Sequence, residues 1–239
     1  MQILRIENLS HAFGQLKVLE DVNIDLDHGK ITAIIGPNGS GKSTLFNLIS
    51  GVLRPQKGKI RLNGTDVVGM EPYIIARRGI FRTFQDPQPF YNMSVLENVK
   101  TASLLNGTAS GEGLLDILAL CNLENEANTD AADLSFANLR FLELARVMAA
   151  KPKLLLADEP FSGLSTSEIK LASDLLAKIR DQFKASILMT GHLVGHLANA
   201  AQDFIVLHRG KVIARGSVDQ VRKDPAVQET YLGKDNAED

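Results

Sequence analysis

The chain has 239 residues, of which 44% are hydrophobic, and a formal net charge of -2 without long runs of lysine or arginine. This composition is ordinary for a globular protein of one or two domains, and it argues against nucleic acid as a partner. No apolar stretch approaches the roughly 20 residues that cross a bilayer, and the N-terminus lacks the apolar segment of a secretory signal, so we expect a cytosolic protein. The single cysteine, Cys121, falls in the apolar pattern LLDILALCNL and is interpreted as a core residue.

In chain order, the first segments predict strands, a glycine-rich loop and a helix. Residues 22–26 alternate between apolar and polar, which indicates a half-buried strand. The apolar run at 31–36 predicts a buried strand, and 43–50 predicts the helix that follows the loop. Further on, Asn63 and Gly64 form the dipeptide typical of a tight hairpin turn.

From about residue 86 the pattern becomes helical and remains so to about 150. Ser94 and Glu97 have the spacing of a capping box at the start of a helix, and further helices are expected over about 112–122 and 136–150. Alternation of strands and helices then returns, which is typical of a parallel sheet. This part predicts a helix at 167–183, a strand at 185–191 and a hairpin at 204–216.

Residues 36–43, GPNGSGKS, match the phosphate-binding pattern G-x-x-x-x-G-K-[ST] between a predicted strand and a predicted helix, the context that the pattern requires. Glycines let backbone N–H groups surround a phosphate, and the helix N-terminus adds partial positive charge. In this interpretation Lys42 neutralises β- and γ-phosphate oxygens, the Ser43 hydroxyl binds Mg²⁺, and Thr44 donates toward the α-phosphate. A glycine-rich turn without a ligand is the weaker alternative. The predicted ATP-binding residues of this loop are Gly36, Pro37, Asn38, Gly39, Ser40, Gly41, Lys42, Ser43 and Thr44.

A second apolar strand, LLLADE at 154–159, ends in two carboxylates. Parallel sheets deliver such side chains to a ligand crevice at the ends of their strands. Asp158 is predicted to hold Mg²⁺ directly or through water, and Glu159 is the candidate general base for the water that attacks the γ-phosphate. A solvated acidic pair before Pro160 is the alternative, which the upstream phosphate loop disfavours.

The order of these motifs resembles the nucleotide-binding subunits of ABC transporters over nearly the full chain. The loop is followed by Gln85 after a strand, by LS at 134–135, by LLLADEP and by His192 after another strand. GIFRTFQDPQPFYNMSVLENV at 79–99 and DPAVQETYLG at 224–233 look like the subunits that energise uptake of branched-chain amino acids, or the related urea and amide importers.

The resemblance implies an α/β fold: a P-loop NTPase core with a mostly parallel sheet, an N-terminal antiparallel β subdomain and an inserted helical subdomain. A single ATP-binding domain would then span 1–239. Its core and β subdomain would occupy 1–85 and 151–239, and the helical subdomain would occupy 86–150.

The resemblance also implies roles for three residues outside these motifs. Phe13 would stack on adenine, although a core phenylalanine is the alternative. Gln85, taken as the end of its strand, would reach Mg²⁺ and the attacking water, and a solvated glutamine is the alternative. His192 would contact the γ-phosphate, whereas an isolated histidine is more often a plain surface residue.

The sequence departs from the family pattern at 134–138, where LSFAN replaces LSGGQ. In the family this segment caps a helix that closes on the ATP of the opposite subunit, so Ser135, Phe136, Ala137 and Asn138 are predicted to face a partner's nucleotide. Both glycines are absent, and the Phe136 ring occupies a position where backbone must approach phosphate. Our hypothesis is an intact nucleotide-binding half-site with a weakened signature, which would leave one of two composite sites slow and would suit a heterodimer. A working, shifted geometry is the alternative.

Two further departures concern dimer contacts: Ser165 replaces a usual Asp, and Gly191 and Leu193 flank His192 where acidic residues are common. The expected partners are a second ATP-binding subunit, identical or related, and membrane-spanning permease subunits that dock near residues 85–91. Pro89, Phe90 and Tyr91 suit such a contact, with packing inside the helical subdomain as the alternative.

A substrate-binding protein would be an indirect partner, nucleic acid is not expected, and the chain would lie in the cytoplasm on the inner face of the cell membrane. Two other functions remain open at this point. One is a soluble ABC-type ATPase, for example of the iron-sulfur assembly type. The other is a regulatory nucleotide-binding subunit with little turnover. A small-molecule kinase is disfavoured by LSFAN and LADEP at this spacing.

Overall fold

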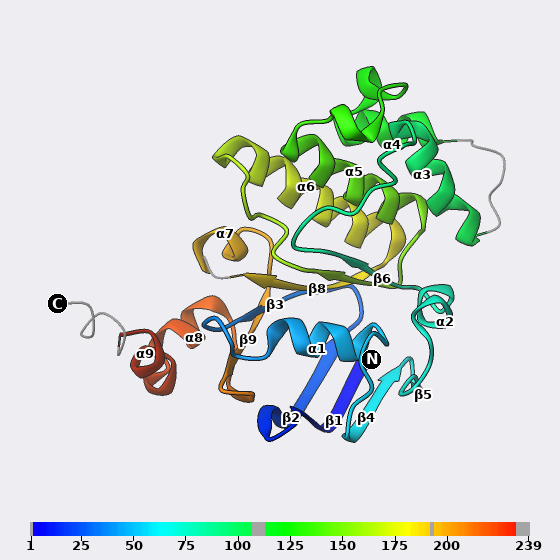
Figure 1. Cartoon of the computed structure of the whole chain (residues 1–239). Coiled ribbons are helices and arrows are strands. Elements are labelled where there is room, and N and C mark those ends of the chain that lie inside the picture. The colour runs from blue at the N-terminus through cyan, green and yellow to red at the C-terminus, as the bar shows by residue number, and fades with distance from the viewer. Residues whose placement is uncertain (1, 107–112, 192–193, 233–239) are drawn as a thin grey trace.

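The computed structural model describes residues 2–106, 113–191 and 194–232. Two β-sheets enclose helix α1 (Lys42–Ile49), and a group of helices covers the other face of the larger sheet (Figure 1). This is the predicted α/β arrangement, with a mostly parallel sheet and an antiparallel sheet near the N-terminus. Among the described residues, no helix is both long and apolar enough to cross a membrane.

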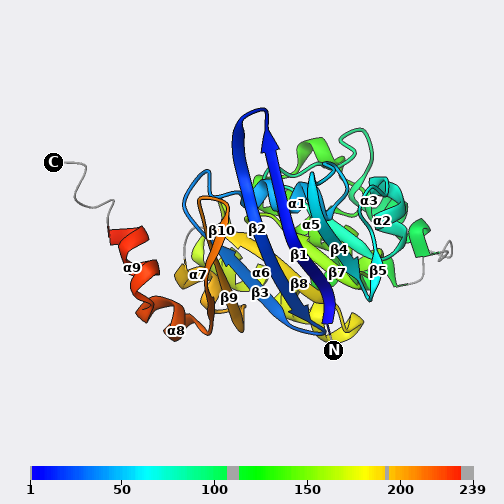
Figure 2. The same ribbon diagram turned by 90° about the horizontal axis from the view of Figure 1, so that it is seen from below.

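The smaller sheet is antiparallel and has the strand order β2-β1-β4-β5. Figure 2 shows its long strands β1 and β2 side by side in front of the larger sheet. The predicted Asn63-Gly64 turn is confirmed: it joins β4 to β5, and both residues have positive φ angles, 47° and 79°, as a tight hairpin turn of this type requires. The strands are β1 (Gln2–Phe13), β2 (Leu16–Asp27), β4 (Lys57–Leu62) and β5 (Thr65–Asp66).

The larger sheet has the strand order β10-β9-β3-β8-β7-β6, in which all neighbours are parallel except the hairpin of β9 and β10. Its central strands are buried on both faces, which explains their unbroken apolar runs. The strands are β3 (Ile31–Ile35), β6 (Ile80–Thr83), β7 (Leu154–Ala157), β8 (Ser186–Gly191), β9 (Asp203–His208) and β10 (Lys211–Gly216).

Most of the helices between β6 and β8 pack on the face of this sheet opposite α1 (Figure 1). The predicted capping box is confirmed: the Ser94 hydroxyl accepts the Glu97 N–H, and Glu97 accepts the Ser94 N–H at 2.8 Å. Part of the helix expected over 112–122 lies outside the described residues. The helices are α2 (Pro72–Arg77), α3 (Val95–Ser103), α4 (Leu114–Leu120), α5 (Phe136–Ala149), α6 (Thr166–Phe183), α7 (Val194–Ala198), α8 (Val218–Lys223) and α9 (Pro225–Leu232), with short 3₁₀ turns at Leu104–Asn106, Glu124–Glu126 and Ala131–Asp133.

The larger sheet separates two hydrophobic cores. Leu156 and Leu188 belong to the core shared with α1 and the smaller sheet, whereas their neighbours Leu155 and Ile187 belong to the core beneath the helices. This alternation follows from the two-residue period of a strand. Cys121 is fully buried in the helical core, as predicted, and burial raises the pKa of its thiol to about 12.

A candidate nucleotide-binding cleft

The loop between β3 and α1 is wrapped around the side chain of Lys42. Its ammonium group donates to the carbonyl oxygens of Gly36, at 2.7 Å, and Pro37, at 3.1 Å. Gly36 is required here, since a Cβ atom would lie 2.1 Å from the carbonyl oxygen of Leu207. Burial lowers the pKa of Lys42, while the negative charges of Glu159 and Asp158 oppose that shift. The Lys42 charge therefore lies beside the backbone of the glycine-rich loop.

The loop lines a cleft of about 320 Å³ that brings together several predicted site residues. Its walls also include Leu16 and Val18 from the edge strand β2. The Phe13 ring, at the end of β1 in the same hairpin, is 51% exposed and makes an edge contact with His11 at 4.9 Å between ring centroids. It is therefore no core phenylalanine. The predicted site residues that line the cleft are Asn38, Gly39, Ser40, Gly41, Lys42, Ser43, Thr44, Gln85 and Glu159.

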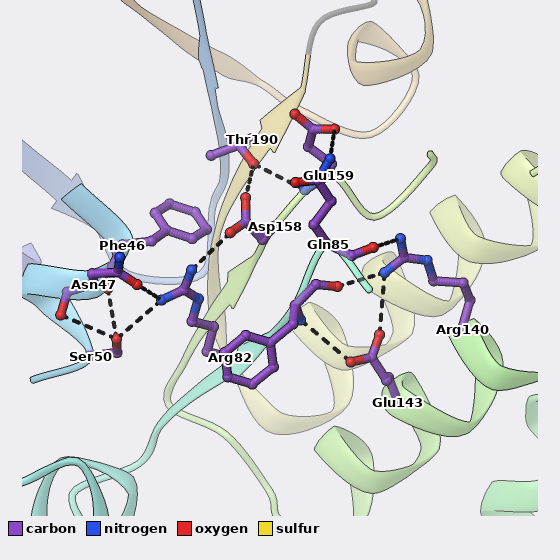
Figure 3. Close-up of polar contacts among 11 residues, drawn as sticks. Phe46, Asn47, Ser50, Arg82, Gln85, Arg140, Glu143, Asp158, Glu159 and Thr190 are labelled. Atoms are coloured by element: carbon purple, nitrogen blue, oxygen red, sulfur yellow. Dashed lines mark hydrogen bonds and ion pairs between the residues drawn. The ribbon is translucent and has the colours of Figure 1, made fainter. Parts of the chain in front are cut away.

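The two predicted acidic residues follow β7 directly and are held by β8. Asp158 is only 6% exposed, and its two oxygens accept from the Thr190 hydroxyl at 2.8 Å and the Arg82 guanidinium at 2.9 Å (Figure 3). The Glu159 N–H donates to the same Thr190 hydroxyl oxygen at 3.0 Å. Glu159 has a φ of 46°, an uncommon conformation for a residue with a side chain, which typically persists where surrounding contacts enforce it. These contacts exclude a merely solvated acidic pair.

Gln85 lies two residues beyond the end of β6, so the prediction that it ends the strand is wrong. The strand stops at Thr83, and α5 supplies partners for the next backbone groups: Arg140 donates to the carbonyl oxygens of Phe84, at 2.6 Å, and Gln85. The Gln85 amide still reaches the cleft, where its nitrogen lies 3.5 Å from a Glu159 carboxylate oxygen.

Helix α5 holds the segment after β6 at further points. Glu143 accepts the Phe84 N–H at 3.4 Å and pairs with Arg140 at 3.4 Å, and both side chains are buried (Figure 3). Burial raises the pKa of Glu143, although the Arg140 charge opposes the shift. Arg146 donates to the Gln88 carbonyl at 2.7 Å. The segment is therefore attached to α5 through charge-assisted hydrogen bonds, which are stronger than neutral ones.

The signature segment forms the N-terminus of the same helix. The Ser135 hydroxyl accepts the Asn138 N–H at 3.2 Å, while helix geometry leaves the N–H groups of Phe136 and Ala137 without intrahelical acceptors. The Phe136 ring is 44% exposed and lies 5.2 Å from the Arg140 guanidinium carbon. A Cβ atom on Gly163 would lie 2.6 Å from this ring. The ring thus lies between the first turns of its own helix, α5, and the loop before α6.

Of the two other departures from the family pattern, the structure describes the one at Ser165. Ser165 is the N-cap of α6 and forms a capping box with Glu168, so it has a local role in starting that helix. His192 and Leu193 lie outside the described residues.

Sequence reasoning missed Arg82 and Thr190, which hold Asp158 from the two neighbouring strands. Both are polar residues within buried strands, and that was the available signal, because buried polar groups must find partners. Their partners, however, could not be identified from spacing.

The oxygen donors near the cleft fit Mg²⁺, which prefers carboxylate, hydroxyl and amide oxygens and is usually held jointly with substrate phosphates. Asp158, Ser43 and Gln85 supply such atoms. The described residues contain no cluster of three or more His, Cys, Asp and Glu side chains suited to a metal.

Known proteins resemble this chain along almost its whole length. A family model described as ABC transporter matches residues 19–162, and one described as branched-chain amino acid ATP-binding cassette transporter matches 211–237. The probable branched-chain amino acid transport ATP-binding protein LivG of Archaeoglobus fulgidus is 36% identical and aligns with 100% of this chain and 98% of its own. The high-affinity branched-chain amino acid transport ATP-binding protein LivG of Escherichia coli K12 is 33% identical, with 97% and 98% covered. A crystal structure of the ADP conformation of an ATP-binding cassette of an ABC transporter has a TM-score of 0.88 and 31% identity, and the match covers 98% of this chain and 99% of that one.

Proposed function

This chain belongs to the ABC transporter family as an ATP-binding subunit with ATPase activity coupled to transport, and from that premise we propose that it uses Mg-ATP to drive uptake of branched-chain amino acids. The observation that carries the proposal is the cleft in which Lys42, Gln85 and Glu159 converge, with Asp158 buried behind them. The substrate class follows from what the relatives transport and from the match at 211–237.

Each part of the nucleotide has a proposed group of residues. Phe13 stacks on adenine, which suits a half-exposed ring on the hairpin that borders the cleft. Backbone N–H groups of residues 36–44 and the ammonium group of Lys42 hold the phosphates. Ser43, Gln85 and Asp158 hold Mg²⁺, which when bound neutralises negative charge on the β- and γ-phosphates.

Glu159 is the proposed general base for the attacking water. Its backbone is fixed by Thr190, and its carboxylate lies 3.5 Å from the Gln85 amide, so a water molecule beside this pair would be within reach of both groups. His192 is proposed to contact the γ-phosphate from the end of β8. Together these residues place a water in line with the bond to be broken.

A second ATP-binding subunit completes the proposed site. The N–H groups of Phe136 and Ala137, together with Ser135 and Asn138, face the partner's γ-phosphate. We keep the hypothesis that LSFAN makes one composite site slower than the other. The Phe136 ring beside the end of the helix supports this hypothesis. The persistence of the backbone N–H donors argues against it.

The permease subunits are proposed to dock beside residues 85–91. A cleft of about 280 Å³ opens there, with Phe84, Phe90 and Leu105 among its lining residues. Phe90 and Tyr91 are each about half exposed, whereas Pro89 is buried and packs within the protein. The proposal accordingly assigns the chain to the cytoplasm, on the inner face of the membrane, with a substrate-binding protein as an indirect partner. Residues 86–150 then act as a helical subdomain within the single domain.

The test is Mg-ATP hydrolysis by the purified chain over a range of protein concentrations, with Glu159→Gln as the variant and ATP binding measured in parallel. We expect turnover to rise more steeply than protein concentration, since two chains form each site. We expect the variant to bind ATP and to lose about 10²–10⁴-fold in rate, the usual contribution of a general base.

The other outcomes separate the alternatives. Binding without turnover would indicate a required partner with a different signature, or a regulatory subunit. Turnover that survives in Glu159→Gln would remove Glu159 from the mechanism, and failure to bind ATP would overturn the proposal. Co-purification with cytosolic iron-sulfur proteins instead of permease subunits would replace transport as the function.

A further inference from the structure

Arg82 is a buried cation in the middle of β6, with a side chain only 10% exposed, and none of the recognised motifs accounts for it. We infer that Arg82 is a positioning residue that fixes the Asp158 carboxylate relative to α1 and thereby sets the Mg²⁺ dependence of nucleotide binding. The inference rests on the proposed role of Asp158 as a metal-binding residue.

The sheet places Arg82 and Asp158 on the same face. Leu156, two residues before Asp158, belongs to the core shared with α1, and so does Ile80, two residues before Arg82. Because side chains alternate along a strand, Arg82 and Asp158 also point toward α1 from neighbouring strands. Thr190 reaches Asp158 from the other side, from β8.

The guanidinium group joins three elements (Figure 3). Its Nη2 donates to Asp158 at 2.9 Å, and its Nη1 donates to the Asn47 side chain of α1 at 2.6 Å. The guanidinium carbon also lies 5.6 Å from the Phe46 ring and 5.1 Å from the Phe84 ring. These contacts leave it little freedom, so the group acts as a rigid fork between α1 and β7.

The Arg82 guanidinium group connects the two parts of the proposed metal site, which are Ser43 on α1 and Asp158 after β7. Helix α1 begins with Lys42 and Ser43, and Asn47 lies one turn beyond Ser43. Fixing Asn47 to Asp158 therefore fixes the Ser43 hydroxyl relative to the Asp158 carboxylate.

A nearby cation also repels Mg²⁺, so two effects of Arg82 oppose each other. Asp158 is almost completely buried, so its carboxylate depends on neighbouring side chains to hold it in place. The hydrogen bond from Arg82 keeps it oriented before any metal arrives. Each carboxylate oxygen accepts only one of the two hydrogen bonds from Thr190 and Arg82, which leaves lone pairs for the metal or its water. We therefore expect positioning to outweigh repulsion.

The test measures binding of a fluorescent ATP analogue to the full chain, first with EDTA and then over a Mg²⁺ titration, in Arg82→Met and Arg82→Lys. We expect unchanged affinity in EDTA and a rise of about 10- to 100-fold in the Mg²⁺ concentration for half-saturation, as is usual when the partner of a metal-binding side chain is lost. Arg82→Lys should also be impaired, because an ammonium group lacks the planar fork that holds Asn47 and Asp158 in a fixed relative position. Arg215→Met is the matched control, since Arg215 pairs with Asp203 at 2.8 Å on the β9–β10 hairpin.

Two more variants keep the outcome decisive. Asn47→Ala leaves the Arg82–Asp158 pair intact and should shift the Mg²⁺ titration in the same direction by less, which covers the case in which Arg82→Met fails to fold. Asp158→Asn should itself shift the titration. If Asp158→Asn shifts it while the Arg82 and Asn47 variants do not, or if the Arg82 variants bind Mg²⁺ more tightly, the inference fails alone. If Asp158→Asn has no effect, the proposed metal-binding role of Asp158 fails with it.

Discussion

The nucleotide end and the signature end of this chain are built in different ways. At the nucleotide end, Lys42 and Asp158 are buried and each is held by at least two hydrogen bonds to named groups. At the signature end, Ser135 and Phe136 are exposed, and the groups that would meet a ligand are backbone N–H groups of a helix terminus.

This difference bears on how each end tolerates substitution. Buried charged side chains depend on the identity of every partner, because a lost partner leaves a charge without solvation. Backbone N–H donors are present whatever the side chain. A substitution at the signature end therefore leaves the donors in place and alters only how closely a ligand can approach them. Arg140 and Glu143 connect the two ends, since they lie on the signature helix and hold the backbone of the segment that carries Gln85.

The largest expected effect is on this connection. Arg140→Met removes the ion-pair partner of the buried Glu143, which should lower the free energy of unfolding by about 3–5 kcal/mol. In a chain of this size, thermal unfolding should then begin roughly 10 °C lower. Arg140→Met combined with Glu143→Leu should recover most of the loss. If the single variant is as stable as the parent, or the double variant recovers nothing, the connection is not a coupled buried pair.

The second effect concerns the nucleotide end alone. Lys42→Met should weaken ATP binding by about 10- to 100-fold, as expected for loss of hydrogen bonds to a charged group. Because burial already lowers the pKa of Lys42, the nucleotide-free variant should be at least as stable as the parent in thermal unfolding. Lys30→Met, which removes an exposed ion pair with Asp27, is the control. Equal loss of binding in both variants would contradict a specific phosphate contact.

A smaller effect is expected at the signature end. Restoring glycine at both positions, Phe136→Gly with Ala137→Gly, should raise turnover by at most about tenfold, the equivalent of roughly 1.4 kcal/mol in the barrier. It should also lower stability by about 0.5–1 kcal/mol for each glycine placed in the helix. Turnover is measured beside Ser135→Ala, which removes the cap and should slow the reaction. Unchanged turnover in the glycine variant would show that the backbone donors suffice and that LSFAN is fully competent.

The smallest effect, no change at all, is expected of ATP on the reactivity of Cys121, which lies away from both ends. With a pKa of about 12, the buried thiol should react with a thiol reagent at pH 8 roughly a thousandfold more slowly than in unfolded chain. Since Cys121 lies in the helical core, ATP should leave this rate unchanged. A rate that falls markedly with ATP would show that the nucleotide end stabilises the helical region as well, and the two regions would no longer be independent.

Most of the fold was accessible from the sequence because its signals are local. The glycine loop, the Ser94 capping box and the Asn63-Gly64 turn each act within a few residues, and all three occur as predicted. The end of β6 was misplaced because a distant helix supplies partners for the backbone of Phe84 and Gln85. The family resemblance supplied roles for Phe13, Gln85 and His192 that spacing alone could not.

By itself the sequence determined the glycine-rich loop, the two acidic residues and the apolar runs of the buried strands. Only the tertiary structure decided how Asp158 is held: Arg82 lies 76 residues away along the chain and Thr190 lies 32 away. Their meeting depends on the strand order β3-β8-β7-β6, which places β7 between the strands that carry them. Backbone N–H and C=O groups are nearly the same at every residue, so they do not select which strands become neighbours. Strand order therefore follows from the packing of the whole chain.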